Sequence, residues 1–245
     1  MTTNALRPTN KRRIYPILVG CLLLLALIGG TLSQRVSAQG SATPILVVIN
    51  SSYAQAPFGA YLGEILRAEG INSYDVKELS ALTAGDLTSH DLTILAETTL
   101  TSGQAALFNN YVNNSNGRLI AMRPDAQIAG LFGLGADNGT QNDGYLGLQP
   151  GVSWSSGQPA AGLTSTTLQI HGTVTRRAIG TGTILAQLYS NATTSVPYPA
   201  VAGGANGRTV AYMYDLARSV VMTRQGNPAN ANVDTDGDGV LRSID

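Results

Sequence analysis

One short apolar segment, residues 44–50, constrains the fold more than any other part of the chain. It reads Pro-Ile-Leu-Val-Val-Ile-Asn, with five consecutive apolar residues, most of them β-branched. A strand without polar positions has no face suited to water, so it is typical of a parallel sheet covered by helices on both sides. Asn50, Ser51 and Ser52 follow it at the carboxyl end. In open α/β sheets, ligands bind at that end.

The first half of the chain continues in a strand–helix rhythm. The apolar positions in residues 58–70 recur at helical spacing, and Thr101 and Gln104 form a capping box that predicts the start of another helix. Short apolar or alternating runs predict further strands at residues 73–79, 91–96 and 118–123. Short connections between such elements are typical of a doubly wound parallel sheet.

The second half has a different composition. Residues 133–165 are rich in Gly, Asn, Gln and Ser, and we expect one strand there, at 145–148. Further strands are predicted at 166–171 and 183–189, and Asn206-Gly207 predicts a hairpin turn between 198–203 and 208–214. The predicted fold is therefore α/β, with three layers, a mainly parallel sheet and an added β-rich second half.

Residues 1–38 have the layout of a secretory signal peptide. Lys11-Arg12-Arg13 precedes an apolar run over residues 14–28, and small residues stand at Val36 and Ala38, before the predicted cleavage point. Residues 39–43 form a short polar lead-in. We expect a secreted, extracellular protein that contacts the membrane only through this N-terminal segment. The alternative is an uncleaved helix that anchors the protein in the membrane, because the apolar run approaches spanning length.

Charge and cysteine content exclude several classes of function. After residue 38 the chain carries ten basic and fifteen acidic residues, and Lys77 is its only lysine. An acidic chain without a basic patch is unsuited to nucleic acid. Cys21 is the only cysteine and lies in the predicted signal peptide, which excludes a disulfide or a thiolate nucleophile in the mature chain. The sequence contains no nucleotide or flavin signature.

Four segments together resemble a known family. They are residues 45–50, residues 91–97 ahead of the Thr101 helix, residues 116–122, and residues 207–216. In this combination they are similar to the ThuA-like (trehalose-utilisation) group of the class I glutamine amidotransferase-like superfamily. The resemblance covers roughly residues 43–224 and implies a flavodoxin-like three-layer fold for a domain over residues 44–224. The chain also resembles N-terminal modules of larger secreted bacterial proteins, in which domains with carbohydrate-related roles can follow.

The catalytic residue of that superfamily has no counterpart here. Its amidotransferases use a cysteine on an elbow after the central strand, where this chain has Arg123-Pro124-Asp125. No Gly-x-Ser-x-Gly elbow occurs either. ThuA-like proteins commonly carry a histidine after this strand, and Arg123 stands in its place. Glutaminase chemistry is therefore not expected, and a ThuA-like activity cannot be transferred.

Polar residues follow several predicted strands. Carboxylate, guanidinium, amide and hydroxyl groups can bind a polyol or sugar through directional hydrogen bonds. The candidate ligand-binding residues are Asn50, Ser51, Ser52, Glu97, Arg123 and Asp125. The alternative is that these side chains cap turns and helices and pair with one another.

Acid–base chemistry has three candidates, Glu97, Asp125 and His171. His171 follows a predicted strand, and its alternative role is a hydrogen-bonded structural imidazole near a turn. His90 is expected to be a surface loop residue. The two histidines lack the spacing of a zinc site.

The C-terminal segment, residues 225–245, is an acidic tail or linker that contains a calcium-loop-like pattern. Acids at alternate positions and a backbone carbonyl can surround one cation. The predicted ligands are Asp234, Asp236, Asp238, the carbonyl of Val240, and Asp245. A solvated linker is the alternative.

Three functions remain open from the sequence. The first is a secreted or cell-surface non-catalytic ThuA-like module that binds carbohydrate or a cell-wall ligand. The second is a hydrolase or isomerase acting on a sugar derivative. The third is a structural spacer at the front of a larger extracellular protein.

Overall fold

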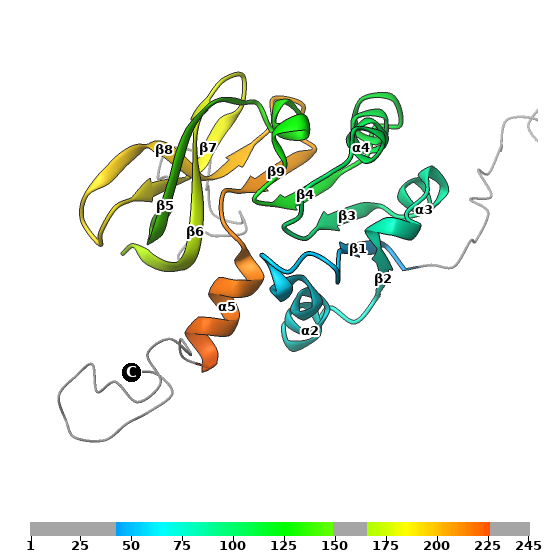
Figure 1. The fold of residues 1–245 in the computed structure, drawn as a ribbon, viewed down its shortest axis with the longest axis horizontal. Helices are drawn as coiled ribbons and strands as arrows, with labels where there is room; N and C mark the ends of the chain where they lie inside the picture. The colour runs from blue at the N-terminus through cyan, green and yellow to red at the C-terminus, as the bar shows by residue number, and fades with distance from the viewer. Residues whose placement is uncertain (1–42, 149–165, 226–245) are drawn as a thin grey trace, which may run out of the picture. The chain divides into compact units, whose positions relative to one another are not determined.

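The computed structural model describes residues 43–148 and 166–225 of the 245-residue chain. These residues form one nine-stranded mixed sheet with the order β2-β1-β3-β4-β9-β8-β7-β5-β6 (Figure 1). The strand β9 has four strands on each side. One side of the sheet is parallel and the other is antiparallel, so the α/β class is confirmed for the described part.

The parallel side resembles an open α/β sheet in its strand order. It comprises β1 (Ile45–Ile49), β2 (Tyr74–Glu78), β3 (Leu92–Leu95), β4 (Leu119–Met122) and β9 (Thr209–Tyr212). Each neighbouring pair among them is parallel. Counted in chain order among themselves, these five strands follow the order 2-1-3-4-5.

The strand β1 is buried on both faces, as the sequence predicts. Leu46 and Val48 point into one hydrophobic core, and Val47 points into a second core on the other face. None of these three side chains is more than 1% exposed. Because successive side chains of a strand point to opposite faces, the unbroken apolar run supplies both cores.

Helices cover both faces of the parallel strands (Figure 1). One face carries η1 (Pro57–Ala60), α2 (Tyr61–Ala68) and α5 (Leu216–Gln225), whose apolar residues pack in the smaller core. The other face carries η2 (Leu79–Ala81), α3 (Ala84–Thr88), α4 (Ser102–Asn114) and η3 (Ala126–Phe132). The predicted capping box is confirmed, since Thr101 and Gln104 exchange hydrogen bonds at the start of α4.

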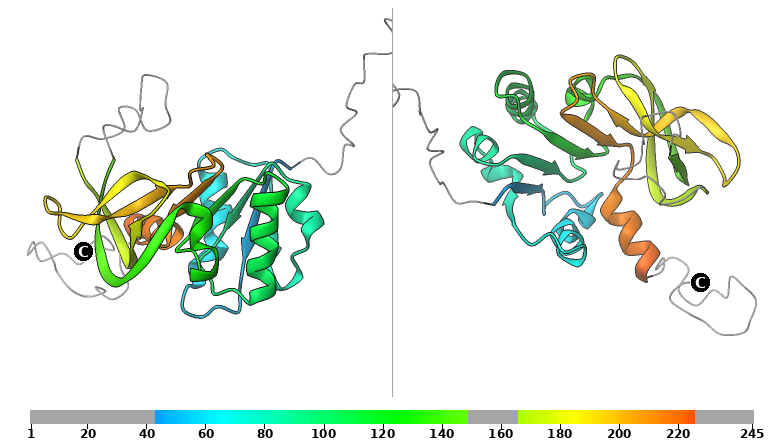
Figure 2. Two further views of the ribbon diagram at one scale, coloured as in Figure 1. Left: turned by 90° about the horizontal axis from the view of Figure 1, so that it is seen from above. Right: turned by 180° about the vertical axis from the view of Figure 1, so that it is seen from behind.

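The antiparallel side belongs to the same sheet. It comprises β5 (Leu134–Leu148), β6 (Leu168–Ile179), β7 (Thr183–Tyr189) and β8 (Ser195–Gly203). The predicted hairpin is confirmed, because β8 pairs antiparallel with β9. Figure 2 shows these strands as a twisted section next to the parallel strands.

The expectation of a mainly parallel sheet is wrong for the sheet as a whole. Four of its pairings are antiparallel, because the β-rich second half extends the sheet through β9. The strand β5 also begins at Leu134, well before the predicted strand at 145–148. Most side chains of its first half are exposed, so that half shows no hydrophobic pattern, and its pairing with β6 is interrupted by register shifts.

No helix within residues 43–148 or 166–225 is long and apolar enough to cross a membrane. The predicted signal peptide or anchor, residues 1–38, lies outside the described residues.

Candidate functional site

A small polar recess lies at the carboxyl edge of the parallel strands. Glu97 follows β3, Arg123 follows β4 and Asp215 follows β9. The carboxyl-edge recess is lined by Gln55, Ala56, Glu97, Arg123, Thr173, Asp215 and Arg218, and its volume is about 20 Å³. A cavity of that size holds about one water molecule. The recess therefore cannot enclose a sugar ring.

Glu97 and Arg123 form an ion pair in this recess. Glu97 is only 9% exposed, and the Nε of Arg123 also donates a hydrogen bond of 2.9 Å to the hydroxyl of Thr175. Arg123 has a φ of 40°, in the left-handed region that few non-glycine residues adopt. Its N–H donates to the carbonyl of Tyr212 at 2.7 Å, which ties this turn to β9. Such strained positions cluster at functional sites.

Two buried acids of the recess, Glu97 and Asp215, have raised pKa values, and Arg123 and Arg218 are the neighbouring cations. Burial raises the pKa of Glu97 to about 7, with Arg123 opposing the shift and the Asp215 charge adding to it. Burial also raises the pKa of Asp215, which is 5% exposed. The Oδ1 of Asp215 accepts the N–H of Arg218 at 3.2 Å, within the first turn of α5. Paired acids of this kind can hold a proton and, with a water molecule, perform acid–base chemistry.

The strand β6 closes the recess from the antiparallel side. Gly172, on this strand, has a φ of +94°, and a Cβ there would lie 2.6 Å from the Nε of Arg218. The positive φ favours glycine at this position, and the atoms that a Cβ would meet belong to the flexible side chain of Arg218 on α5. The guanidinium of Arg218 also lies 5.7 Å from the ring centroid of Phe58, a cation–π contact.

Asp125 lies outside the recess. It caps a helix, which is the structural role that the sequence offered as the alternative to ligand binding. Its two carboxylate oxygens accept the N–H of Leu100 at 3.0 Å and the N–H of Gln127 at 2.8 Å. The side chain thus caps η3 and fastens the loop before α4.

Asn50, Ser51 and Ser52 do not line the recess either. The amide of Asn50 donates to the hydroxyl of Thr98 at 2.9 Å, and its oxygen accepts the N–H of Ser52 at 3.2 Å. Ser51 and Ser52 are exposed. These residues form a turn that is stabilised by its own side chain.

His171 lines a different and larger cavity. Its backbone N–H donates to the hydroxyl of Ser219 at 3.1 Å, and its carbonyl accepts from the same hydroxyl at 3.2 Å, which joins β6 to α5. The cavity beside it has a volume of about 370 Å³. The structure thus brings together Glu97 and Arg123 among the predicted site residues, and it leaves Asp125 and His171 outside their recess.

Only Glu97 and Arg123, two of the seven residues that line the recess, are predicted from the sequence. Asp215 follows β9, but residues 208–214 look like the second strand of a hairpin, and their parallel pairing with β4 is not apparent. The rule that parallel strands end at a common edge would have included Asp215 once that pairing was known. Thr173, Thr175 and Arg218 have no recognisable local signal.

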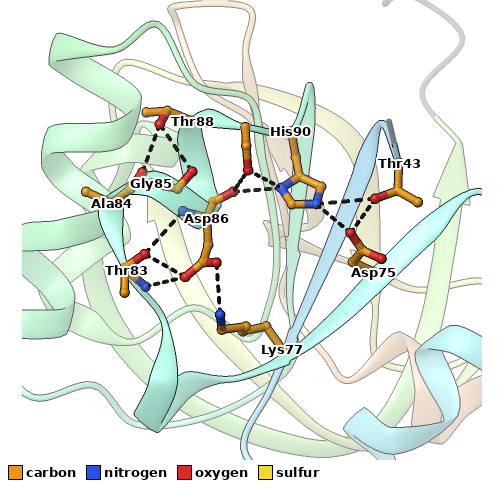
Figure 3. A network of polar contacts seen from close by, with 10 residues as sticks. Thr43, Asp75, Lys77, Thr83, Ala84, Gly85, Asp86, Thr88 and His90 are labelled. Atoms are coloured by element: carbon orange, nitrogen blue, oxygen red, sulfur yellow. Dashed lines mark hydrogen bonds and ion pairs between the residues drawn. The ribbon is translucent and has the colours of Figure 1, made fainter. Parts of the chain in front are cut away.

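His90 belongs to a second polar network, at the amino ends of β1 and β2 (Figure 3). Its side chain is only 8% exposed, so the expected surface position is wrong. Its Nδ1 lies 2.7 Å from the carbonyl of Asp86, and its Nε2 lies 3.2 Å from Asp75, which also accepts a hydrogen bond from Thr43. This network fastens the start of β1 to neighbouring elements.

Metal binding has no candidate within residues 43–148 and 166–225, where no three His, Cys, Asp or Glu side chains come together in a suitable arrangement. The predicted calcium ligands lie outside these residues. They are Asp234, Asp236, Asp238, Val240 and Asp245.

Comparison with protein-family models and with curated proteins returned no match. Among solved structures, the chain is similar to a putative ThuA-like protein from Bacteroides uniformis ATCC 8492, with a TM-score of 0.54 and 12% identity over 76% of this chain and 88% of that one. It is also similar to α-L-fucosidase isoenzyme 2 from Paenibacillus thiaminolyticus, with a TM-score of 0.55 and 13% identity over 75% of this chain and 30% of that one.

A β-galactosidase from Rahnella sp. R3 matches with a TM-score of 0.53 and 12% identity, over 75% of this chain and 31% of that one. The chain thus spans about a third of each glycosidase and most of the ThuA-like protein. At these identities the similarity shows a shared α/β fold and nothing about activity.

Proposed function

We propose that this chain is an exported, non-catalytic ThuA-like module that binds carbohydrate. One observation carries the non-catalytic part of this proposal. The carboxyl-edge recess, where the superfamily would present its nucleophile, contains the Glu97–Arg123 ion pair and has room for about one water molecule. Glu97 and Arg123 pair with each other in this small space, and such an arrangement is suited to stabilising the fold.

Membership of the ThuA-like group is part of the proposal. The parallel strands follow the order 2-1-3-4-5, which is the flavodoxin-like order. The similarity to the putative ThuA-like protein extends over 88% of that protein's length. Both observations favour a flavodoxin-like domain of the class I glutamine amidotransferase-like superfamily, extended here by antiparallel strands.

Carbohydrate is proposed as the ligand because two similar structures are, by name, an α-L-fucosidase and a β-galactosidase. The chain corresponds to less than a third of each of these enzymes. Galactosides and fucosides are therefore the first ligands to test, and export would bring the module into contact with glycans outside the cell.

The test is a glycan array on the purified chain, followed by calorimetry with the sugars that bind. We expect reversible binding without release of any product. Failure to bind any glycan would overturn the carbohydrate proposal and favour the structural spacer. Calcium, proposed to bind the acidic tail, is included in one arm and chelated in the other.

A second candidate is a hydrolase or isomerase, favoured by the raised pKa of Glu97, about 7, next to a recess that admits one water molecule. Turnover of nitrophenyl galactosides or fucosides that is lost in Glu97→Gln would establish this function. Absence of turnover, together with sugar binding, would reject it.

A further inference from the structure

A cavity of about 370 Å³ lies between α5 and the antiparallel strands β5 and β6. We call it the α5 cavity. It is lined by Leu146, Leu168, Gln169, His171, Tyr214, Leu216, Ser219, Val220, Thr223 and Arg224. None of these residues lines the carboxyl-edge recess, so the two spaces are separate. Its volume falls within the range of small-molecule sites, near the lower end.

Three lining residues carry polar groups without an internal partner. Within the described part of the chain, the side chains of Gln169, His171 and Tyr214 form no hydrogen bond, and Tyr214 is only 3% exposed. Gln169 is exposed and His171 is half-buried, and none of the three side chains has an atom among the buried polar atoms that lack a partner. An amide, an imidazole and a phenol that border one cavity and are not engaged with other side chains are therefore available to a ligand with hydrogen-bonding groups.

The charge of the cavity favours a neutral ligand. Arg224 is the one lining residue that carries a permanent charge, and it is paired with Glu69 at 2.8 Å. The remaining walls are largely apolar, with Leu146, Leu216 and Val220 among them. Apolar walls with a few polar groups fit a ring that has C–H faces and hydroxyl edges.

We infer that the α5 cavity is the sugar site of this module and takes a neutral pyranose, either free or at the end of a glycan chain. The inference rests on the proposed carbohydrate-binding function and adds the location and class of the ligand. The apolar walls would pack against the ring, and Gln169, His171 and Tyr214 would bond its hydroxyl groups. The volume limits the bound part to one or two rings.

The experiment uses the full chain and two probes, methyl β-D-galactopyranoside and methyl α-L-fucopyranoside, with affinity measured by calorimetry or saturation-transfer NMR. Val220→Phe places a ring in the cavity and is expected to weaken binding by about tenfold or more. Val221→Phe is the matched control, because Val221 is also half-buried on α5 but does not line the cavity. His171→Ala should weaken binding, and His171→Gln, which keeps a donor and an acceptor, should restore part of it.

The outcomes separate the inference from the function. Loss of binding in Val220→Phe, with normal binding in Val221→Phe, supports the inference, provided that thermal unfolding shows Val220→Phe to be folded. Sugar binding that is unchanged in Val220→Phe and His171→Ala overturns the inference and leaves the function standing. Absence of binding by the wild type, to both the glycosides and immobilised glycans, overturns both. Binding to immobilised glycans that Val220→Phe abolishes supports the site and identifies a chain end as the ligand.

Discussion

Glu97 combines burial with a neighbouring acid, and this makes the stability of the protein depend on pH. Its pKa is raised from 4.5 to about 7, so the folded state binds the proton more tightly than the unfolded state. Its contribution to stability is complete below about pH 4.5 and is lost as the pH rises through 7. The loss is on the order of 1–3 kcal/mol.

We expect Glu97→Gln to reduce the loss of unfolding free energy between pH 5 and pH 8, because glutamine is neutral at every pH. The measurement is the urea-unfolding free energy of both proteins at pH 5 and pH 8. Asp86→Asn is the control. The hydrogen bond from the Thr83 hydroxyl, followed by that from Lys77, lowers the pKa of Asp86 to about 2. Asp86→Asn is therefore expected to change the pH dependence of the unfolding free energy only at acid pH. Equal slopes in the wild type and Glu97→Gln between pH 5 and 8 would contradict the prediction.

Arg123 supplies the counter-charge to Glu97. Removing one partner of a buried ion pair costs about 3–5 kcal/mol when the other partner stays charged. We therefore expect Arg123→Ala to destabilise the protein strongly at pH 8 and much less at pH 5, where Glu97 is protonated. Chemical denaturation at the two pH values measures the difference.

The exposed Arg224–Glu69 pair provides the comparison for Arg123. Arg224→Ala should cost about 0–1 kcal/mol, with little dependence on pH. A loss in Arg123→Ala that is the same at pH 5 and pH 8 would show that the guanidinium acts through packing alone.

The helices and strands of the parallel side were largely predictable from the sequence. The apolar run of β1, the helical spacing of α2 and the capping box of α4 are local patterns that directly reflect burial and hydrogen bonding. The first half of β5 was not predictable, because its mainly exposed residues, rich in Gly and Asn, are held by pairing with β6. Pairing over such a sequence distance leaves no local pattern.

The N-cap of α4 is expected to contribute measurably to stability. Thr101→Ala removes the hydroxyl that accepts the N–H of Gln104 and should cost about 1 kcal/mol. Thr99→Ala makes the same chemical change at an exposed position two residues earlier and should stay within about 0.5 kcal/mol of the wild type. Denaturant midpoints compare the three proteins, and equal losses in both variants would refute the capping role.

Gly172 has a positive φ and lies against the side chain of Arg218 on α5. Alanine there would have an unfavourable φ and would displace Arg218, so we expect Gly172→Ala to cost about 1–3 kcal/mol. Gly130→Ala is the control, because a Cβ at Gly130 meets nothing within 4 Å. Thermal unfolding should separate the two variants, and a neutral Gly172→Ala would show that the positive φ and the Arg218 contact contribute little to stability.

Over the described residues together, the candidate site was only partly predictable. Glu97 and Arg123 follow strands that the sequence reveals, and the structure brings them together. Asp215, Arg218 and Thr173 reach the same recess through the parallel pairing of β9 and the approach of β6, which are properties of the assembled sheet. The α5 cavity likewise arises between a helix and two strands that no motif connects.

The predicted signal peptide leads to an expectation for the N-terminus of the mature protein. If the signal peptide is cleaved after Ala38, the exported protein begins at Gln39 and lacks Cys21. Intact-mass measurement and N-terminal sequencing of the exported protein would check this expectation. A protein that keeps residues 1–38 and sediments with membranes would instead be anchored.

The position of β9 has a consequence for how the chain is synthesised and folded. The middle strand of the sheet, β9, is the last of the described strands in chain order, and its residues 209–212 pair with residues 119–122. Until it emerges, β4 remains an open edge, and the antiparallel strands lack the strand that connects them to the parallel side. Such long-range closure is slow, and incomplete chains expose edges that aggregate. The sheet of the described residues can therefore close only after residues 209–212 have been translated.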